Sequence, residues 1–325
     1  MTILSVREAL GQALREEFDR DEKVFLMGED IGIYGGCFGI SKGLRAEYGP
    51  ERVIDTPLAE SVIVGAGVGA ALKGYRPVVE IMFADFLSLA MDQLVNNAAK
   101  MIYMHDGETT LPLVIRTPQG GGLTLGPHHS QCIESWLLNV PGLKIVLPSS
   151  PYNAKGLLKS AIRDNNPVVF LENKLLYNDK GEVPDGEYTV PIGKADIARP
   201  GKDITVLTYS TIVKKALTAA DALAKEGIDV EVVDILTLKP LDVDTIIKSV
   251  KKTGKAIIAH EAPVFGGAGA EIAATIQQEA FDYLDKPIGR VGSLPIPVPF
   301  SPTLEQAYLL NEQIIMDAVR KTITR

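Results

Sequence analysis

Cysteine is scarce in this sequence, long apolar runs are missing, and each shortage argues against a class of protein. Of 325 residues only Cys37 and Cys132 are cysteines, and they lie far apart without CxxC spacing. Two isolated thiols argue against a disulfide framework and are typical of a reducing compartment. No apolar run approaches the roughly 20 residues that span a bilayer. The N-terminal MTILSVREALGQALREEF is charged from its first turn and has no apolar signal core, so we expect a cytoplasmic protein without a membrane segment.

Basic residues are outnumbered, and several common site motifs do not occur. Lys and Arg number 33 against 41 Asp and Glu, a formal net charge of −8, and no basic cluster is interleaved with aromatics. This balance argues against nucleic acid as a partner and leaves room for a basic protein partner. The sequence contains no GxxxxGK[ST], no GxSxG and no HxxxH, which argues against a P-loop, an α/β-hydrolase and transition-metal catalysis.

What the sequence does contain is a regular alternation of strand-like and helix-like segments. The strand-like runs are VFLMGED, PVVEIMF, PLVIRTP, KIVLPSS and PVVFLEN, then ITVLTYS, VEVVDILTL, KAIIAHEA and IGRVGSL. Continuous β-branched strands separated by helices predict α/β architecture, with mostly parallel sheets covered by helices on both faces.

A change in composition divides the alternation into two domains. Residues 175–203 are polar and rich in Pro, Gly and Asp, as a linker or an extended arm would be. We therefore expect a first domain over residues 1–185, a linker over 186–202 and a second domain over 203–325.

Five local features are candidates for chemistry. Glu60 follows the Thr56–Pro57 turn and opens the apolar stretch SVIVGAGVGAALKG, where a carboxylate needs a partner. His128 and His129 follow a strand at its carboxyl end, where open α/β sheets place their sites, although a pair of solvent-facing histidines is an equal alternative. Phe83 and Phe86 flank the end of another strand and could stack on a heterocycle, although such residues are more often core.

The other two candidates depend more on context. Asp164-Asn165-Asn166-Pro167 ends a helix whose orphan carbonyl groups could hold a monovalent cation, the alternative being a plain capped turn. GGAGAEIAATI (266–276) has GxG at a helix start but lacks the third glycine of a dinucleotide fingerprint. A glycine turn that lets a helix pack on its sheet is the favoured interpretation there, and an NAD-binding or scaffold protein remains the alternative.

Several longer motifs carry a resemblance. In this order, DTPLAES, EIMFADF, HHSQC, AIRDNNPVVFLEN, VEVVDILTLKPLD and PIPVPFSPTLEQ resemble the beta subunits of thiamine-diphosphate-dependent 2-oxo acid dehydrogenases, across essentially the whole chain. The resemblance implies a pyrimidine-binding domain followed by a transketolase-type C-terminal domain. It also implies an α2β2 heterotetramer with the cofactor at the α/β interfaces.

The resemblance implies roles for individual residues. Glu60 would hydrogen-bond the pyrimidine ring of thiamine diphosphate and so promote proton removal from its thiazolium carbon, with Leu58 beside the cofactor. Phe86 would stack on the pyrimidine, Phe83 would be adjacent packing, and His129 would handle protons and position the lipoyl group. The role of His128 stays open. The positions that match a structural potassium site, largely through backbone carbonyls, are Leu113, Ala161, Ile162, Asp164 and Asn166.

The resemblance also implies partners and a reaction. The family's GDG…N motif, which holds the diphosphate and Mg²⁺, does not occur here, so an alpha subunit must supply it and this chain alone should be inactive. The implied activity is that of an oxidoreductase with a lipoyl disulfide acceptor: oxidative decarboxylation of pyruvate and reductive acetylation of lipoyl groups. The acceptor belongs to a dihydrolipoyl acyltransferase core, with its lipoyl domain and peripheral-subunit-binding domain. An acetoin dehydrogenase beta subunit is the second expectation and a branched-chain 2-oxo acid dehydrogenase the third, because much of the acyl pocket belongs to the alpha chain.

Overall fold

The computed structural model describes residues 1–324, which fall into two compact units. The first comprises Met1–Gln119 and Trp136–Ile192, and the second comprises Gly120–Ser135 and Gly193–Arg325. The loop at 120–135 is thus grouped with the C-terminal unit, although it lies in the middle of the expected first domain. No helix among residues 1–324 is both long enough and apolar enough to cross a bilayer.

The first unit is built on a parallel sheet. Its strands lie in the order β6-β7-β5-β4-β2-β3, and each neighbouring pair is parallel. The bounds of the sheet strands are Val24–Gly28 (β2), Val53–Asp55 (β3), Arg76–Glu80 (β4), Val114–Gln119 (β5), Lys144–Val146 (β6) and Val168–Asn173 (β7). A separate antiparallel pair joins β1 (Thr2–Ser5) to β8 (Lys180–Val183).

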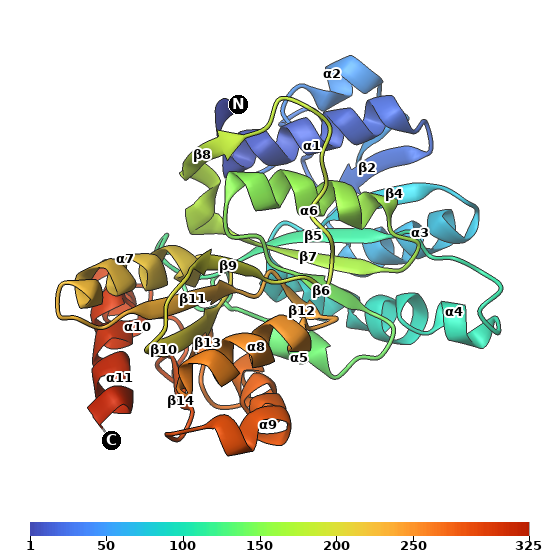
Figure 1. Cartoon of the computed structure of the whole chain (residues 1–325). Coiled ribbons are helices and arrows are strands. Elements are labelled where there is room, and N and C mark those ends of the chain that lie inside the picture. The colour runs from blue at the N-terminus through green and yellow to red at the C-terminus, as the bar shows by residue number, and fades with distance from the viewer. Residues whose placement is uncertain (325) are drawn as a thin grey trace. The chain divides into compact units, whose positions relative to one another are not determined.

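Helices cover this sheet. They are α1 (Val6–Arg20), α2 (Leu44–Tyr48), α3 (Glu60–Leu72), η1 (Ala84–Ala90), η2 (Gln93–Ala98), α4 (Met101–Met104), α6 (Pro151–Arg163) and η3 (Lys174–Asn178). Figure 1 shows α1 and α6 side by side along the strands. Ser5-Val6-Arg7-Glu8 fits the sequence pattern of a capping box, and this box starts α1: Glu8 N–H donates to Ser5 Oγ at 3.2 Å, and Ser5 N–H donates to Glu8 Oε2 at 2.8 Å.

The second unit has a sheet of its own. Its order is β14-β13-β10-β11-β9, parallel except for the antiparallel edge strand β9. The elements are β9 (Asp196–Arg199), β10 (Ile204–Thr208), α7 (Ile212–Ala224), β11 (Val230–Asp234), β12 (Thr237–Lys239), α8 (Val243–Thr253), β13 (Ala256–Pro263), α9 (Ala268–Ala280), η4 (Phe281–Tyr283), β14 (Gly289–Ser293), α10 (Pro302–Tyr308) and α11 (Glu312–Thr324). Helix α5 (Glu134–Leu138) follows the 120–135 loop along the chain.

The sheet of the second unit is covered on both faces. One face of β10, β11 and β13 shares an apolar core with α7 and α11. On the other face, Thr205 Oγ1 is 2.8 Å from both Ser249 Oγ and Thr253 Oγ1 of α8. Both sheets are therefore of the mostly parallel, helix-covered kind that the sequence predicts.

Two segments differ from the sequence expectations. The sequence FLSLAMDQLVNNAAKMIYM (86–104) predicts a single helix, but the chain there forms the end of a 3₁₀ segment, a π-helical segment and a short α-helix. Asn97 Nδ2 donates to the Asp92 carbonyl at 3.3 Å and to Gln93 Oε1 at 3.2 Å, and such side-chain bonds compete with a regular helix ladder. The expected linker, 186–202, contains strand β9, so part of it is edge strand.

Candidate cofactor site

Polar and aromatic side chains gather at the carboxyl ends of strands in the first unit. Glu29 directly follows β2, Glu60 comes five residues after β3, and Phe83 and Phe86 follow β4. Because neighbouring parallel strands end at the same edge of the sheet, three separate stretches of sequence meet there.

Glu60 is the first residue of α3 and is half-buried. No side chain caps this helix, so its first N–H groups have no side-chain acceptor. Leu58, two residues earlier, is 79% exposed, which places an apolar side chain on the surface beside it.

Glu29 is a second acid at this edge that the sequence analysis did not single out. Its side chain is 4% exposed, and its Oε1 has no hydrogen-bond partner among residues 1–324. Burial, with contributions from Glu60 and Asp30, raises its pKa from 4.5 to about 7. The only local signal was an acid directly after a buried strand, and burial of the carboxyl depends on the rest of the unit.

The atoms at this edge fit a polar heterocyclic ligand. Thr56 Oγ1, like Glu29 Oε1, is buried and has no partner within the described chain. Buried polar atoms are normally paired, so unsatisfied ones at a sheet edge mark a place where a ligand or water completes the bonding. A nearby acid that holds its proton near neutral pH is typical of catalytic sites.

The two phenylalanines after β4 differ in exposure. Phe83 is 9% exposed and packs edge-on against Phe38 at 5.9 Å between ring centroids, while Phe86 is half-buried. Their own rings meet at 6.0 Å and 90°. Lys174 Nζ lies 5.4 Å from the centroid of Phe83. Phe83 is thus held inside the unit, and Phe86 is the more accessible ring.

A buried charge cluster lies under this edge. Arg116 is 1% exposed; its Nε and Nη2 donate to Glu172 Oε1 and Oε2 at 2.7 and 2.9 Å, and its Nη1 donates to Glu80 Oε2 at 2.7 Å. Tyr177 Oη also donates to Glu172, at 2.7 Å. Burial raises the pKa of Glu80, which Arg116 opposes. The cluster ties the ends of β4, β5 and β7 together and so fixes the segment that continues to Phe83 and Phe86.

His129 belongs to the second unit, whereas Glu60 belongs to the first. His129 is half-buried and His128 is exposed, with ring centroids 4.3 Å apart at 44°. His129 Nδ1 lies 3.3 Å from the Leu125 carbonyl oxygen, so the ring is anchored to its own loop.

The expected potassium positions gather at the opposite edge of the first unit. They are Leu113, before β5; Ala161 and Ile162, at the end of α6; and Asp164 and Asn166, in the following turn. Burial would raise the pKa of Asp164, but hydrogen bonds from Lys144 and Asn166 outweigh it and lower that pKa. A protein cation already binds two of these carbonyl groups: Arg76 Nη1 donates to the carbonyls of Ile162 and Asp164 at 2.9 and 3.1 Å.

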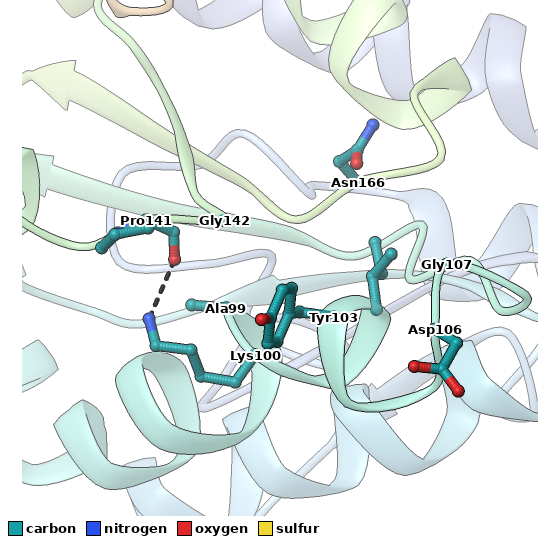
Figure 2. Close-up of a pocket in the computed structure, with 9 residues that line it drawn as sticks. Ala99, Lys100, Tyr103, Asp106, Gly107, Pro141, Gly142 and Asn166 are labelled. Carbon is teal, nitrogen blue, oxygen red and sulfur yellow. Dashed lines mark hydrogen bonds between the residues drawn. The ribbon is translucent and has the colours of Figure 1, made fainter.

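A cavity of about 880 Å³ opens at this same edge. Figure 2 shows Lys100 and Tyr103 facing the Pro141–Gly142 turn, and Lys100 Nζ donates to the Pro141 carbonyl at 2.9 Å. Gly142 is required here, because a Cβ would lie 1.9 Å from the Ala99 carbonyl oxygen. Asn166 also lines the cavity, which lies at the amino ends of the strands and therefore away from Glu60.

The glycine turn at 266–276 serves packing. A Cβ on Gly267 would lie 2.6 Å from His260 Cε1, and one on Gly269 would lie 2.8 Å from His260 Nε2. The glycines therefore let α9 lie directly over the buried imidazole of β13. This agrees with the packing interpretation favoured from the sequence.

Comparison with known proteins identifies both units. Residues 3–180 match the family model described as "Transketolase, pyrimidine binding domain", and residues 193–315 match "Transketolase, C-terminal domain". The pyruvate dehydrogenase E1 component subunit beta of Dictyostelium discoideum is 46% identical, covering 99% of this chain and 92% of that protein. The chain belongs to the family of 2-oxo acid dehydrogenase E1 beta subunits. This confirms the resemblance and the fold class expected from the sequence.

Other members of the family are similar to the same degree. The 2-oxoisovalerate dehydrogenase subunit beta of Bacillus subtilis is 46% identical, covering 99% of each chain. The acetoin:2,6-dichlorophenolindophenol oxidoreductase subunit beta of Cupriavidus necator is also 46% identical, covering 98% of this chain and 97% of that one. A solved split-gene transketolase, described as an inactive beta4 tetramer, superposes with a TM-score of 0.82 at 25% identity over 99% of both chains. Equal identity to beta subunits of different specificity leaves the substrate open.

Proposed function

We propose that this E1 beta subunit forms, with an alpha subunit, the decarboxylase component of a 2-oxo acid dehydrogenase complex. The observation that carries the proposal is the full-length match to E1 beta subunits together with the polar sheet edge around Glu60. Pyruvate is the substrate proposed first, with acetoin second and branched-chain 2-oxo acids third. The reaction is oxidative decarboxylation followed by transfer of the acyl group to a lipoyl disulfide.

Thiamine diphosphate is the cofactor proposed for the polar edge. Its bound thiazolium supplies a carbon nucleophile and an electron sink for decarboxylation. Glu60 would accept a hydrogen bond from the protonated pyrimidine, Phe86 would stack on that ring, and Leu58 would cover its side. Glu29 keeps a proton near neutral pH and would meet a ring nitrogen or a water molecule with its free oxygen.

An alpha subunit completes the proposed site. The chain contains no GDG…N sequence, so the diphosphate and Mg²⁺ would be held by the alpha chain in an α2β2 assembly. A potassium ion remains a proposal for the group around Asp164, where Arg76 already satisfies two of the expected carbonyls. The cytoplasm as the place of action stays a prediction from the sequence.

The acyl acceptor is proposed to be a lipoyl domain of an acyltransferase core, with His129 positioning the lipoyl group and moving a proton at its imidazole. The C-terminal unit would dock on the core's peripheral-subunit-binding domain. The net charge of −8 suits a basic partner, so raised salt should weaken this docking. Affinity that is independent of salt would contradict the electrostatic part.

The test is reconstitution. The chain is purified with the alpha subunit and assayed with pyruvate, acetoin and 3-methyl-2-oxobutanoate, using a lipoyl domain as acceptor. Activity with one of the three, dependent on both chains and on thiamine diphosphate, supports the proposal and settles the substrate. Calorimetry against NAD is the second arm, and NAD binding without thiamine diphosphate binding would contradict the proposal.

A further inference from the structure

The loop that carries His129 has an unusual backbone. Gly120, Gly122 and Gly126 have φ of 92°, 99° and 79°, and Thr124 has φ of 56°. Positive φ is easy for glycine but strained for a β-branched residue, so the loop does not hold Thr124 in this shape by its own preference. Contacts from outside the loop must supply the restraint.

A buried carboxylate from α10 supplies it. Glu305 is 0% exposed; its Oε1 accepts the N–H of Gly122 at 2.8 Å and its Oε2 accepts the N–H of Thr124 at 2.9 Å. Each carboxylate oxygen therefore accepts one N–H group, and the two N–H groups belong to the residues before and after Leu123. Hydrogen bonds to an ionised acceptor are the strong ones, and their two-point geometry fixes the loop's shape.

A second carboxyl group and two apolar side chains hold the neighbouring residues of the loop. Glu261, at the end of β13 and 6% exposed, accepts the N–H of Gly121 at 2.7 Å. A Cβ on Gly121 would lie 3.2 Å from Leu309 Cδ2, and one on Gly126 would lie 3.0 Å from Phe300 Cδ2. Residues between Glu261 and Leu309 therefore contact the loop from Gly121 to Gly126. His129 follows this loop three residues later.

The buried carboxyl group of Glu305 carries a cost in folding free energy. No lysine, arginine or histidine pairs with Glu305 within residues 1–324, and burying a carboxylate without a cation is expensive. A glutamine would avoid that cost but has a single acceptor oxygen for two N–H donors, and its NH₂ group would face the other N–H. Accepting both N–H groups needs the two oxygens of a carboxyl group.

We propose that Glu305, assisted by Glu261, is a positioning residue that holds the 120–126 loop in the shape that presents His129 for acyl transfer to the lipoyl group. The functional half of this inference rests on the proposed function of His129. The loop-holding half stands on the hydrogen bonds alone, so the two can fail separately.

The experiment compares Glu305→Gln and Glu305→Asp with Glu279→Gln, an exposed glutamate of α9, as the matched control. Hydrogen exchange of the peptide spanning 120–129 is measured by mass spectrometry in the assembled α2β2 enzyme. We expect Glu305→Gln to speed exchange at this peptide on the order of tenfold, because glutamine can accept only one of the two N–H groups and leaves the other amide without its acceptor. Exchange equal to that of Glu279→Gln would overturn the proposal.

Activity is then measured with two acceptors. We expect Glu305→Gln to lower the kcat for the lipoyl domain about tenfold, while reduction of 2,6-dichlorophenolindophenol changes less than about twofold, because only lipoyl transfer needs His129 in place. Glu305→Asp, which keeps the charge, should recover part of the loss. In the His129→Ala background, Glu305→Gln should cost nothing further, since both changes disable one function.

Other results count against the functional half. Equal losses with both acceptors would mean general damage, and faster exchange with unchanged lipoyl transfer would mean that the loop's shape does not matter for the reaction. Full lipoyl transfer by His129→Ala would refute the role of the histidine itself, and the exchange measurement would still decide whether Glu305 holds the loop.

Discussion

Replacing Glu29 by glutamine tests the electrostatics of the candidate site. The folded-state pKa of about 7 lies above the 4.5 of an exposed glutamate, so the folded protein binds this proton more tightly than the unfolded chain does. The stability that the protonated acid contributes is complete below pH 4.5 and is lost as the pH rises to about 7. Glutamine carries no charge at any of these pH values, so the variant lacks this loss.

The magnitude follows from the shift. The difference between 4.5 and about 7 corresponds to about 3 kcal/mol if it is fully expressed. Asp30 is exposed and Glu60 is half-buried, so water screens part of the interaction, and we expect about 1–2 kcal/mol. Glu29→Gln should therefore be more stable than the natural protein by that amount at pH 8, with the advantage fading towards pH 5.

The assay is urea unfolding at pH 5, 6, 7 and 8, with Glu51→Gln as an exposed control that should show no such trend. An advantage that is absent at pH 8, or equal at all four pH values, would refute the reasoning. Turnover of the reconstituted enzyme is measured in parallel. We expect it to fall in Glu29→Gln, because a group that titrates near neutral pH is removed from beside Glu60.

Three further changes test other parts of the molecule. Glu60→Gln should change the free energy of unfolding by less than about 1 kcal/mol, as is usual for a residue outside the core. It should lower turnover on the order of 10²-fold or more, and near-normal turnover would refute the role assigned to Glu60. Phe86→Leu should weaken thiamine diphosphate binding in the assembled enzyme up to about tenfold, the worth of one aromatic stack, as calorimetry would show, and unchanged affinity would place the ring away from the cofactor. Burial lowers the pKa of His260 from 6.5 to about 4, so its stability contribution is present above pH 6.5 and lost towards pH 4, by about 3 kcal/mol. His260→Phe should remove this acid sensitivity in urea titrations, whereas the exposed His105→Phe should not, and identical pH profiles for the two would contradict the assigned burial.

Local patterns predicted the regular elements well where local physics dominates. The capping box at Ser5 marks the start of α1, and the Asp164–Pro167 turn follows the end of α6. The helix predicted over 86–104 was wrong, because the side chains of Asn96 and Asn97 donate to Asp92 and Gln93 there and compete with a regular helix ladder. Local patterns also missed that residues 196–199 pair with β11, because this short exposed edge strand (DIAR) has no apolar alternation to signal it.

The residues of the candidate site also fall into two groups: those that the sequence suggests and those that only the structure makes notable. Glu60 and Phe86 could be proposed from the sequence because each lies next to a strand, in a motif that carries the family resemblance. Glu29 and Glu305 were not found, since an acid after a strand or on a short helix is ordinary in sequence. Only the burial of their carboxyls, and the amides placed around Glu305, make them notable.

The order of residues by itself determined the two parallel sheets, the helices between them and the family, because hydrophobic period and motif spacing are properties of the chain as written. The tertiary structure decided which acids lose their water, which backbone amides face a carboxylate 181 positions away, and which histidine stays neutral. Those outcomes depend on desolvation and on contacts between distant segments, and both come into existence only when the chain packs.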